Sequence, residues 1–82
     1  AAARAREAGA RRALAIFRDD ALATAARNLE VVRQTWELGR ATVIEVLDEQ
    51  RRYLEIERAY TAALKEAYDA RQALRRALGD VL

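Results

Sequence analysis

The sequence predicts an all-α fold, in which two antiparallel helices form a coiled-coil hairpin. Composition is one basis for this prediction, because the 82 residues contain no proline and only 3 glycines, as is typical of long helices and coiled coils. The other basis is a single set of stop and start signals, at Gly39 and Thr42, in the middle of the chain. We therefore expect one domain, residues 1–82, with helices at residues 3–38 and 42–78 and a turn at 39–41.

The first expected helix carries an apolar seam in its second half. Apolar side chains alternate there at spacings of three and four residues, which is the heptad pattern of a coiled coil: Leu22, Ala25, Leu29, Val32 and Trp36. Before this stretch the apolar positions drift to a neighbouring face, and Gly9, Asp19 and Asp20 lower the helix propensity. We expect a register change or a bend near Asp19. The uncapped opening, with arginines at the positive end of the helix dipole, suggests a segment from within a longer helix.

The expected turn combines a helix stop with a helix start. Gly39 follows Leu38 at the position where a glycine in the left-handed conformation ends a helix without steric cost. Thr42 is placed to cap the next helix, and Glu45 follows three residues later, which completes the capping-box pattern. A stop and a start this close together predict a helical hairpin.

The second expected helix has two adjacent apolar stripes, and we expect Gly79 to end it. A seam with heptad spacing runs along it, formed by Val46, Tyr53, Ile56, Tyr60, Ala63, Ala67, Ala70, Leu74 and Ala77. A second stripe lies beside the seam and consists of Val43, Leu47, Leu54, Leu64 and Leu78. Because one partner helix covers only one stripe, we expect the second stripe to contact another subunit or another segment.

The composition argues against catalysis, metal binding and nucleic-acid binding. Histidine and cysteine are absent, so the usual acid–base and soft-metal sites cannot be built, and we expect no enzymatic activity, no cofactor and no metal site. The net charge of +2 arises from 15 basic and 13 acidic residues that are interspersed, without the one-sided basic cluster of a nucleic-acid-binding helix. No apolar run is long enough to span a bilayer.

Charge is uneven along the expected hairpin. Four acids lie near the turn, Glu37, Glu45, Asp48 and Glu49, against the single Arg40, while the open end is rich in arginine. The preference of acids for the first turn of a helix, and of arginines for its last turn, explains part of this pattern. It leaves Asp48 and Glu49 without a reason, so an acidic tip with a functional role is the alternative.

The turn and its flanks resemble the TolC-like family of outer-membrane efflux ducts. The resemblance rests on residues 36–50, WELGRATVIEVLDEQ, which are similar to the family pattern aromatic-x-x-Gly-x-x-(Ser/Thr), followed by two hydrophobic residues, an acid and Val-Leu-Asp-x-Gln. Residues 17–20, 28–30 and 73–79 are similar to the segments that lead into this turn and end the returning helix. The match covers nearly the whole chain and best fits the second of the family's two internal repeats.

The resemblance implies a fragment of a larger α-helical tunnel. Ducts of this family are homotrimers, and such hairpins end at the periplasmic entrance, where they dock onto a periplasmic adaptor protein that joins the duct to an inner-membrane pump. The implied docking tip is Leu38, Gly39, Arg40 and Ala41. The implied entrance-lining and gating residues are Trp36, Glu45 and Asp48. The implied location is the periplasm, as part of an outer-membrane protein of a Gram-negative-type cell envelope.

Two other interpretations remain open at this point. The hairpin can be a structural coiled-coil spacer or an oligomerisation stalk without a transport role. It can also be a nucleic-acid-binding coiled coil, although the acidic turn argues against this class.

Ala41 departs from the duct family, since some members have an arginine there that helps to close the entrance. The complete turn pattern favours the duct, because a spacer has no need of it.

Overall fold

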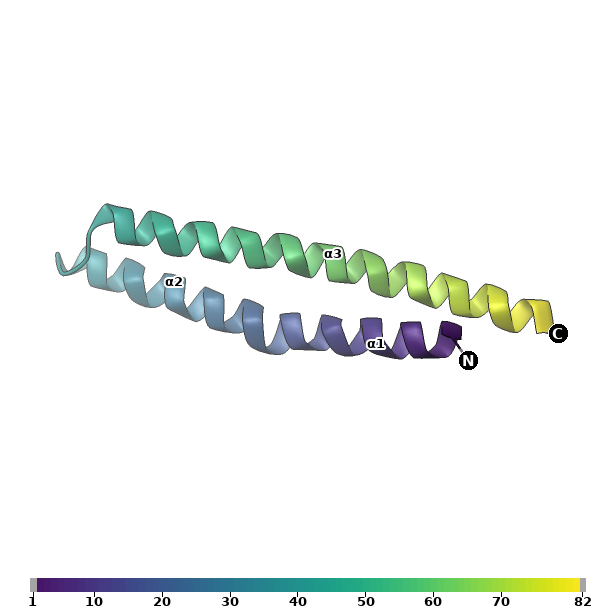
Figure 1. The fold of residues 1–82 in the computed structure, drawn as a ribbon. Helices are drawn as coiled ribbons and strands as arrows, with labels where there is room; N and C mark the ends of the chain where they lie inside the picture. Colours follow the sequence, from purple (N-terminus) through teal and green to yellow (C-terminus); the bar gives the residue numbers. More distant parts are fainter. Residues whose placement is uncertain (1, 82) are drawn as a thin grey trace.

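The computed structural model describes residues 2–81, which form an antiparallel helical hairpin (Figure 1). The first arm consists of α1 (Ala2–Ile16), a π-helical turn η1 (Phe17–Ala21) and α2 (Leu22–Glu37), which continue one another. The second arm is the single helix α3 (Val43–Val81). The described residues contain no strand, so the predicted all-α hairpin is confirmed.

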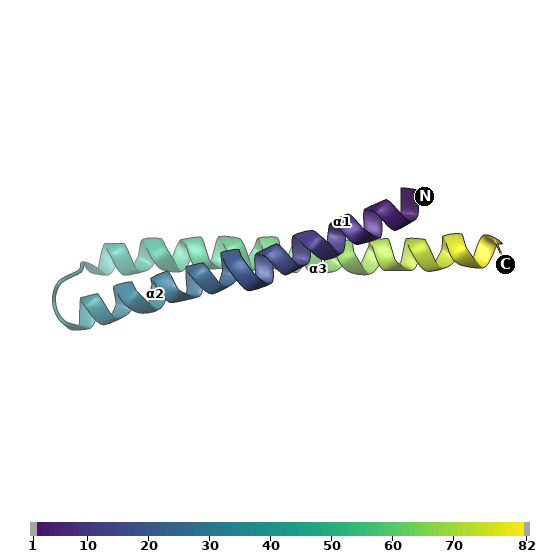
Figure 2. The same ribbon diagram turned by 90° about the horizontal axis from the view of Figure 1, so that it is seen from below.

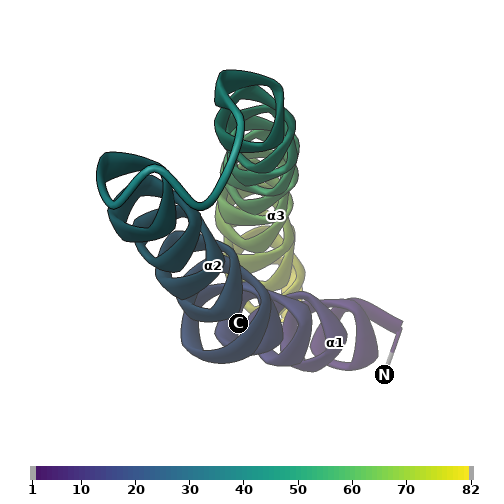
Figure 3. The same cartoon turned by 90° about the vertical axis from the view of Figure 1, so that its left-hand side faces the viewer.

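The hairpin is a thin rod with extents of 64 × 15 × 13 Å. The free ends of α1 and α3 lie at the end opposite the turn (Figure 1). The two arms cross along the rod (Figure 2), and the first arm passes from one flank of α3 to the other when it is viewed from the turn (Figure 3). This crossing is the geometry expected of helices that pack along heptad seams.

One apolar seam forms the interface between the arms. Every residue of the predicted seam of α3, between Val46 and Ala77, is buried or half-buried. In the part of the chain that the structure describes, the only fully buried apolar residues are Ala25, at 6% exposure, and Ala70, at 0%. Both are alanines, since the axes of two helices approach closely only where the contact side chains are small. The hairpin therefore has an interface but no large enclosed core.

Gly39 ends the first arm as predicted. Its φ of 73° lies in the left-handed region, and no other residue between 2 and 81 has a positive φ. The Gly39 N–H donates to the carbonyl of Trp36 at 2.8 Å, and the Arg40 N–H donates to the carbonyl of Thr35 at 2.9 Å. These two hydrogen bonds form a Schellman motif, which satisfies carbonyl groups that the end of α2 leaves free.

Thr42 and Glu45 form the predicted capping box at the start of α3. The Glu45 N–H donates to Thr42 Oγ1 at 3.2 Å, and the Thr42 N–H donates to Glu45 Oε2 at 3.1 Å. Each side chain satisfies a backbone donor that has no partner within the helix. The stop and the start signals are thus both formed, and together they fix the reversal of the chain.

Gly79 does not end α3, contrary to the prediction. The helix continues through Gly79 to Val81, and Gly79 does not have a positive φ. A glycine permits the left-handed conformation but does not impose it, so a helix ends at glycine only where the chain leaves the helix axis. The other ends agree with the predicted ranges to within one residue.

The predicted register change near Asp19 is confirmed as the π-helical turn η1. The Leu22 N–H donates to the carbonyl of Phe17, five residues earlier in the chain. Arg18 Nε donates to Asp19 Oδ1 at 2.9 Å, and this hydrogen bond lowers the pKa of Asp19 below its ordinary value. Because both side chains are more than half exposed, water screens the pair and its contribution to stability is small.

An ion pair joins the two arms near their open end. Arg6 Nε and Nη2 donate to Oε1 of Glu66, at 2.9 and 2.6 Å. The two side chains are 49% and 47% exposed, so the pair is worth at most about 1 kcal/mol. The pair contributes little to stability, but it shows which part of α1 lies against which part of α3.

Gly39 and Gly79 form a matched pair for testing the turn. Apart from the adjoining backbone, no atom lies within 4 Å of a Cβ at either position, so a methyl group fits at both, and the two sites differ in backbone conformation. We expect Gly39→Ala to lower the free energy of unfolding by about 1 kcal/mol or more, because alanine is disfavoured at positive φ. Gly79→Ala should leave it unchanged or raise it slightly, because alanine is favoured in a helix but position 79 lies in the last turn of α3. Urea unfolding followed by circular dichroism measures both, and equal effects would contradict the assignment of the turn to Gly39.

Candidate functional site

The candidate docking tip lies at the closed end of the hairpin. Leu38, the C-cap of α2, is 72% exposed, the largest value among the large apolar residues in the described range. Gly39 and Arg40 are also exposed, and Ala41 is half-buried. The reversal brings these four predicted residues together, and they offer an apolar side chain and a cation to solvent.

Two apolar residues at the start of α3 extend the tip. Val43 is 53% exposed and Ile44 is 66% exposed. Ile44 was not predicted as a site residue. The heptad pattern of α3 could have indicated it. Residues seven apart share one face of a coiled-coil helix, and Ile44 is followed at this spacing by Arg51, Arg58 and Lys65. An isoleucine at the tip end of an otherwise basic row faces away from the seam, and it is therefore available to a partner.

Trp36 lies in the last turn of α2 and is 45% exposed. Its carbonyl accepts the hydrogen bond from Gly39 that helps to end the helix. A half-covered indole offers a partner both an apolar face and an N–H donor. Trp36 therefore adjoins the tip. It is not among the residues that line the hollow beside Glu45 and Asp48.

The two predicted entrance acids differ in what they contact. Glu45 Oε2 accepts the N–H of Thr42 in the capping box, so this carboxylate already has a structural role. Asp48 Oδ1 lies 3.8 Å from Arg51 Nη1, and the Asp48 side chain is 49% exposed. Glu45 is thus held by a backbone N–H, and Asp48 lies beside a cation.

Two arginines just beyond the turn offset the acids. Arg52 Nη1 donates to Glu49 Oε1 at 2.6 Å, and Arg51 lies beside Asp48. Both pairs have the three-residue spacing that brings side chains together on a helix surface, so the sequence contained the signal. The predicted acidic tip includes charges only as far as Glu49, where four acids face one arginine. When Arg51 and Arg52 are included, the excess of negative charge near the turn is smaller by two.

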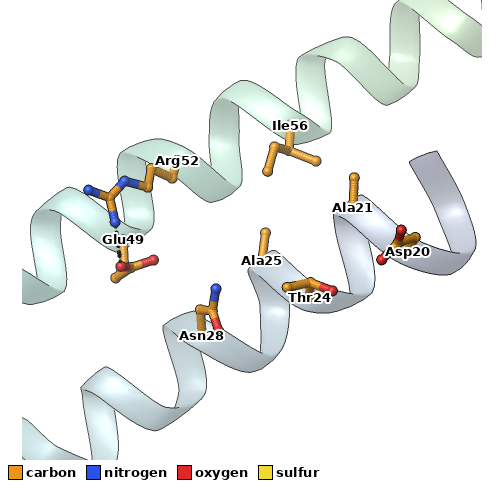
Figure 4. Close-up of a pocket in the computed structure, with 8 residues that line it drawn as sticks. All are labelled: Asp20, Ala21, Thr24, Ala25, Asn28, Glu49, Arg52 and Ile56. Atoms are coloured by element: carbon orange, nitrogen blue, oxygen red, sulfur yellow. Dashed lines mark hydrogen bonds and ion pairs between the residues drawn. The ribbon is translucent and has the colours of Figure 1, made fainter. Parts of the chain in front are cut away.

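Glu45 and Asp48 line one shallow hollow together with Val32 of α2, Glu49 and Arg52. A second hollow follows along the rod (Figure 4) and is lined by Asp20, Ala21, Thr24, Ala25, Asn28, Glu49, Arg52 and Ile56. Small side chains on the first arm leave this space, and the Arg52–Glu49 pair lies at one end of it (Figure 4). Because Glu49 and Arg52 line both hollows, they join them into one polar face.

The polar face can present carboxylate, guanidinium, hydroxyl and amide groups to ions or to a polar partner. Within residues 2–81, no three of the acidic side chains come together as they would around a metal ion. In the same part of the chain, no helix combines the length and the apolar character that crossing a membrane requires.

The second stripe of α3 is another candidate contact surface. All five predicted residues of this stripe are between 42% and 53% exposed: Val43, Leu47, Leu54, Leu64 and Leu78. Tyr68, at 64% exposure, adds to it, and both Leu64 and Tyr68 line a groove against Leu14 of α1. An apolar stripe of this length on one helix face promotes association with another protein surface.

Comparisons of the chain with protein-family models, with curated proteins and with solved structures gave no match. The family interpretation of the sequence therefore stays a prediction. The functional argument depends on the tip, the polar face and the apolar stripe of this hairpin.

We expect the stripe of α3 to drive self-association of the hairpin. Leu54→Gln should shift the protein toward smaller species in sedimentation velocity and preserve its helicity, because Leu54 is 44% exposed. Ile56→Gln is the matched control, since Ile56 is two residues away but lies in the half-buried seam. It should lower the free energy of unfolding by about 1–3 kcal/mol. A Leu54→Gln protein that associates as strongly as the parent would exclude the stripe as the contact.

Proposed function

We propose that this chain is a periplasmic entrance hairpin of a TolC-like outer-membrane efflux duct. In this role it docks onto a periplasmic adaptor protein and forms part of the tunnel entrance of a tripartite efflux or secretion system. The observation that carries the proposal is the turn, in which a left-handed Gly39 and a Thr42–Glu45 capping box expose Leu38 and Arg40 at a narrow tip. The pattern of residues 36–50 adds to it through its resemblance to the duct family.

Docking at the tip depends on shape. The missing side chain of Gly39 leaves open space at the point of reversal, where no atom other than those of Gly39 and its chain neighbours lies within 4 Å of the Cβ position. The turn of another hairpin can approach this backbone closely, while Leu38 and Ile44 supply exposed apolar contacts on either side. Arg40 adds a charge that can select an acidic or carbonyl-rich partner surface.

The entrance function depends on the polar face. In a homotrimer, three copies of Glu45 and Asp48 are repeated around one axis. A ring of carboxylates attracts cations and repels anions in a narrow passage. Glu45 keeps its charge while it caps α3, and Arg51 beside Asp48 partly offsets the second acid. Trp36, in the last turn of α2, is expected to help hold the entrance closed.

The competing proposal is a structural spacer or an oligomerisation hairpin. The exposed stripe of α3 supports it, since a stalk that only assembles needs an apolar face and no special tip. The two proposals differ at the turn. A spacer should tolerate any change at the tip that leaves both arms folded.

Docking can be tested with Gly39→Val in the full-length protein that carries this hairpin. The substitution adds bulk at the contact and places a β-branched residue at positive φ, so cross-linking to the adaptor should fall several-fold. Ala62→Val is the control, because it adds a β-branched residue at an exposed position far from the tip and outside the seam and the stripe, and it should leave cross-linking unchanged. Cross-linking that survives Gly39→Val would favour the spacer.

The entrance acids can be tested separately from the fold. Glu45→Gln removes the charge and keeps an acceptor for the capping box, which accommodates glutamate or glutamine at this position. Combined with Asp48→Asn, it should lower the cation preference and the cation sensitivity of the assembled duct in single-channel recordings. Glu57→Gln, an exposed acid on another face of α3, is the control and should change neither. Unchanged conductance in the double variant would remove these acids from the entrance.

A further inference from the structure

The seam of the first arm contains one irregular step. Leu14, Phe17 and Ala21 form one seam with steps of three and four residues, and a second seam, displaced from the first by one residue, continues with Leu22, Ala25, Leu29, Val32 and Trp36. A regular coiled-coil seam alternates three and four, so the step from Phe17 to Leu22 is one residue too long. The seam of α3 has no such step, because spacings of three and four alternate throughout when Glu49 is included.

An uninterrupted α-helix would place arginines in the interface. When the spacing of the α2 seam is continued toward the N-terminus, it reaches Arg18, Ala15, Arg11, Ala8 and Arg4 in turn, so an arginine takes every second position. In the structure these three arginines are exposed, whereas Leu14 and Phe17 are half-buried. Because burial of unpaired guanidinium groups is strongly unfavourable, the regular continuation is the poorer packing.

The π-helical turn η1 lies at the irregular step. The hydrogen bond from the Leu22 N–H to the Phe17 carbonyl spans five residues, so this turn holds one residue more than an α-helical turn. One extra residue rotates the preceding helix by about 100° relative to the following one. On the far side of η1, Arg6 meets Glu66 at 2.6 Å, so α1 remains packed along α3 after the rotation.

We infer that η1 is a register switch that absorbs one extra residue in the first arm. The switch keeps Phe17 and Leu14 against α3 and turns the heptad row of Arg4, Arg11 and Arg18 toward solvent. The outer surface of α1 is basic as a direct result. This inference does not rest on the proposed function, since it follows from the spacing, the burial and the hydrogen bond of the turn.

Deletion of Asp19 tests the switch in the 82-residue chain. The step from Phe17 to Leu22 becomes four residues, so we expect a continuous α-helix whose Tm equals or exceeds that of the parent. Deletion of Ala62, an exposed residue of α3, is the matched control. The regular seam of α3 cannot absorb that loss, and the Tm should fall by roughly 10 °C or more. Asp19→Asn removes the charge that pairs with Arg18 at nearly unchanged helix propensity, and it should change the Tm by only a few degrees or less.

Thiol reactivity reports the rotation directly, because the chain contains no cysteine. Single cysteines can replace Arg11, which is exposed, and Ala10, which is half-buried. The cysteine at position 11 should react faster with a maleimide in the parent and also after deletion of Asp19. A reversed order after the deletion, or a Tm that falls as far as in the Ala62 deletion, would overturn the register switch.

Discussion

The left-handed conformation of Gly39 is the constraint on which the rest of the hairpin depends. Hydrogen bonds satisfy the backbone on both sides of this residue, by the Schellman motif at the end of α2 and by the capping box at the start of α3. The turn therefore has little freedom, and it sets which residues of the two arms lie opposite each other. Val32 and Asp48 line one hollow, Ala25 and Ile56 line the next, and both pairs are centred on the turn.

A hairpin with one seam leaves much of its apolar surface in contact with water. The close contacts are made by small residues such as Ala25 and Ala70, which allow the arms to approach but bury little area each. Larger apolar side chains, including Leu38, Ile44 and Leu64, remain more than two-fifths exposed. The surfaces that make the hairpin suitable for assembly are thus the same surfaces that its own two arms cannot cover.

Local signals explain why the fold was predictable from the sequence. The glycine, the capping box and the heptad seams each act within a few residues, and each appears where it was expected. Gly79 was misjudged because glycine permits a helix end without requiring one. The candidate site was less predictable, since the charge of Asp48 and Glu49 depends on the rotamers and partners of Arg51 and Arg52. The molecules that bind the tip and the stripe are other chains, so the sequence of this chain does not specify them.

The order in which the contacts form follows from the position of the turn. Residues near position 39 meet across a short loop, whereas Arg6 and Glu66 must close a loop of 60 residues. Loop-closure entropy grows with length, so the arms are expected to pair first at the tip and then toward the open end, as a zipper closes. Opening follows the reverse order, and hydrogen exchange begins at the free ends of α1 and α3. The tip then stays ordered while the base of the rod frays, so the exposed residues at the reversal keep their arrangement in a molecule without a deep core.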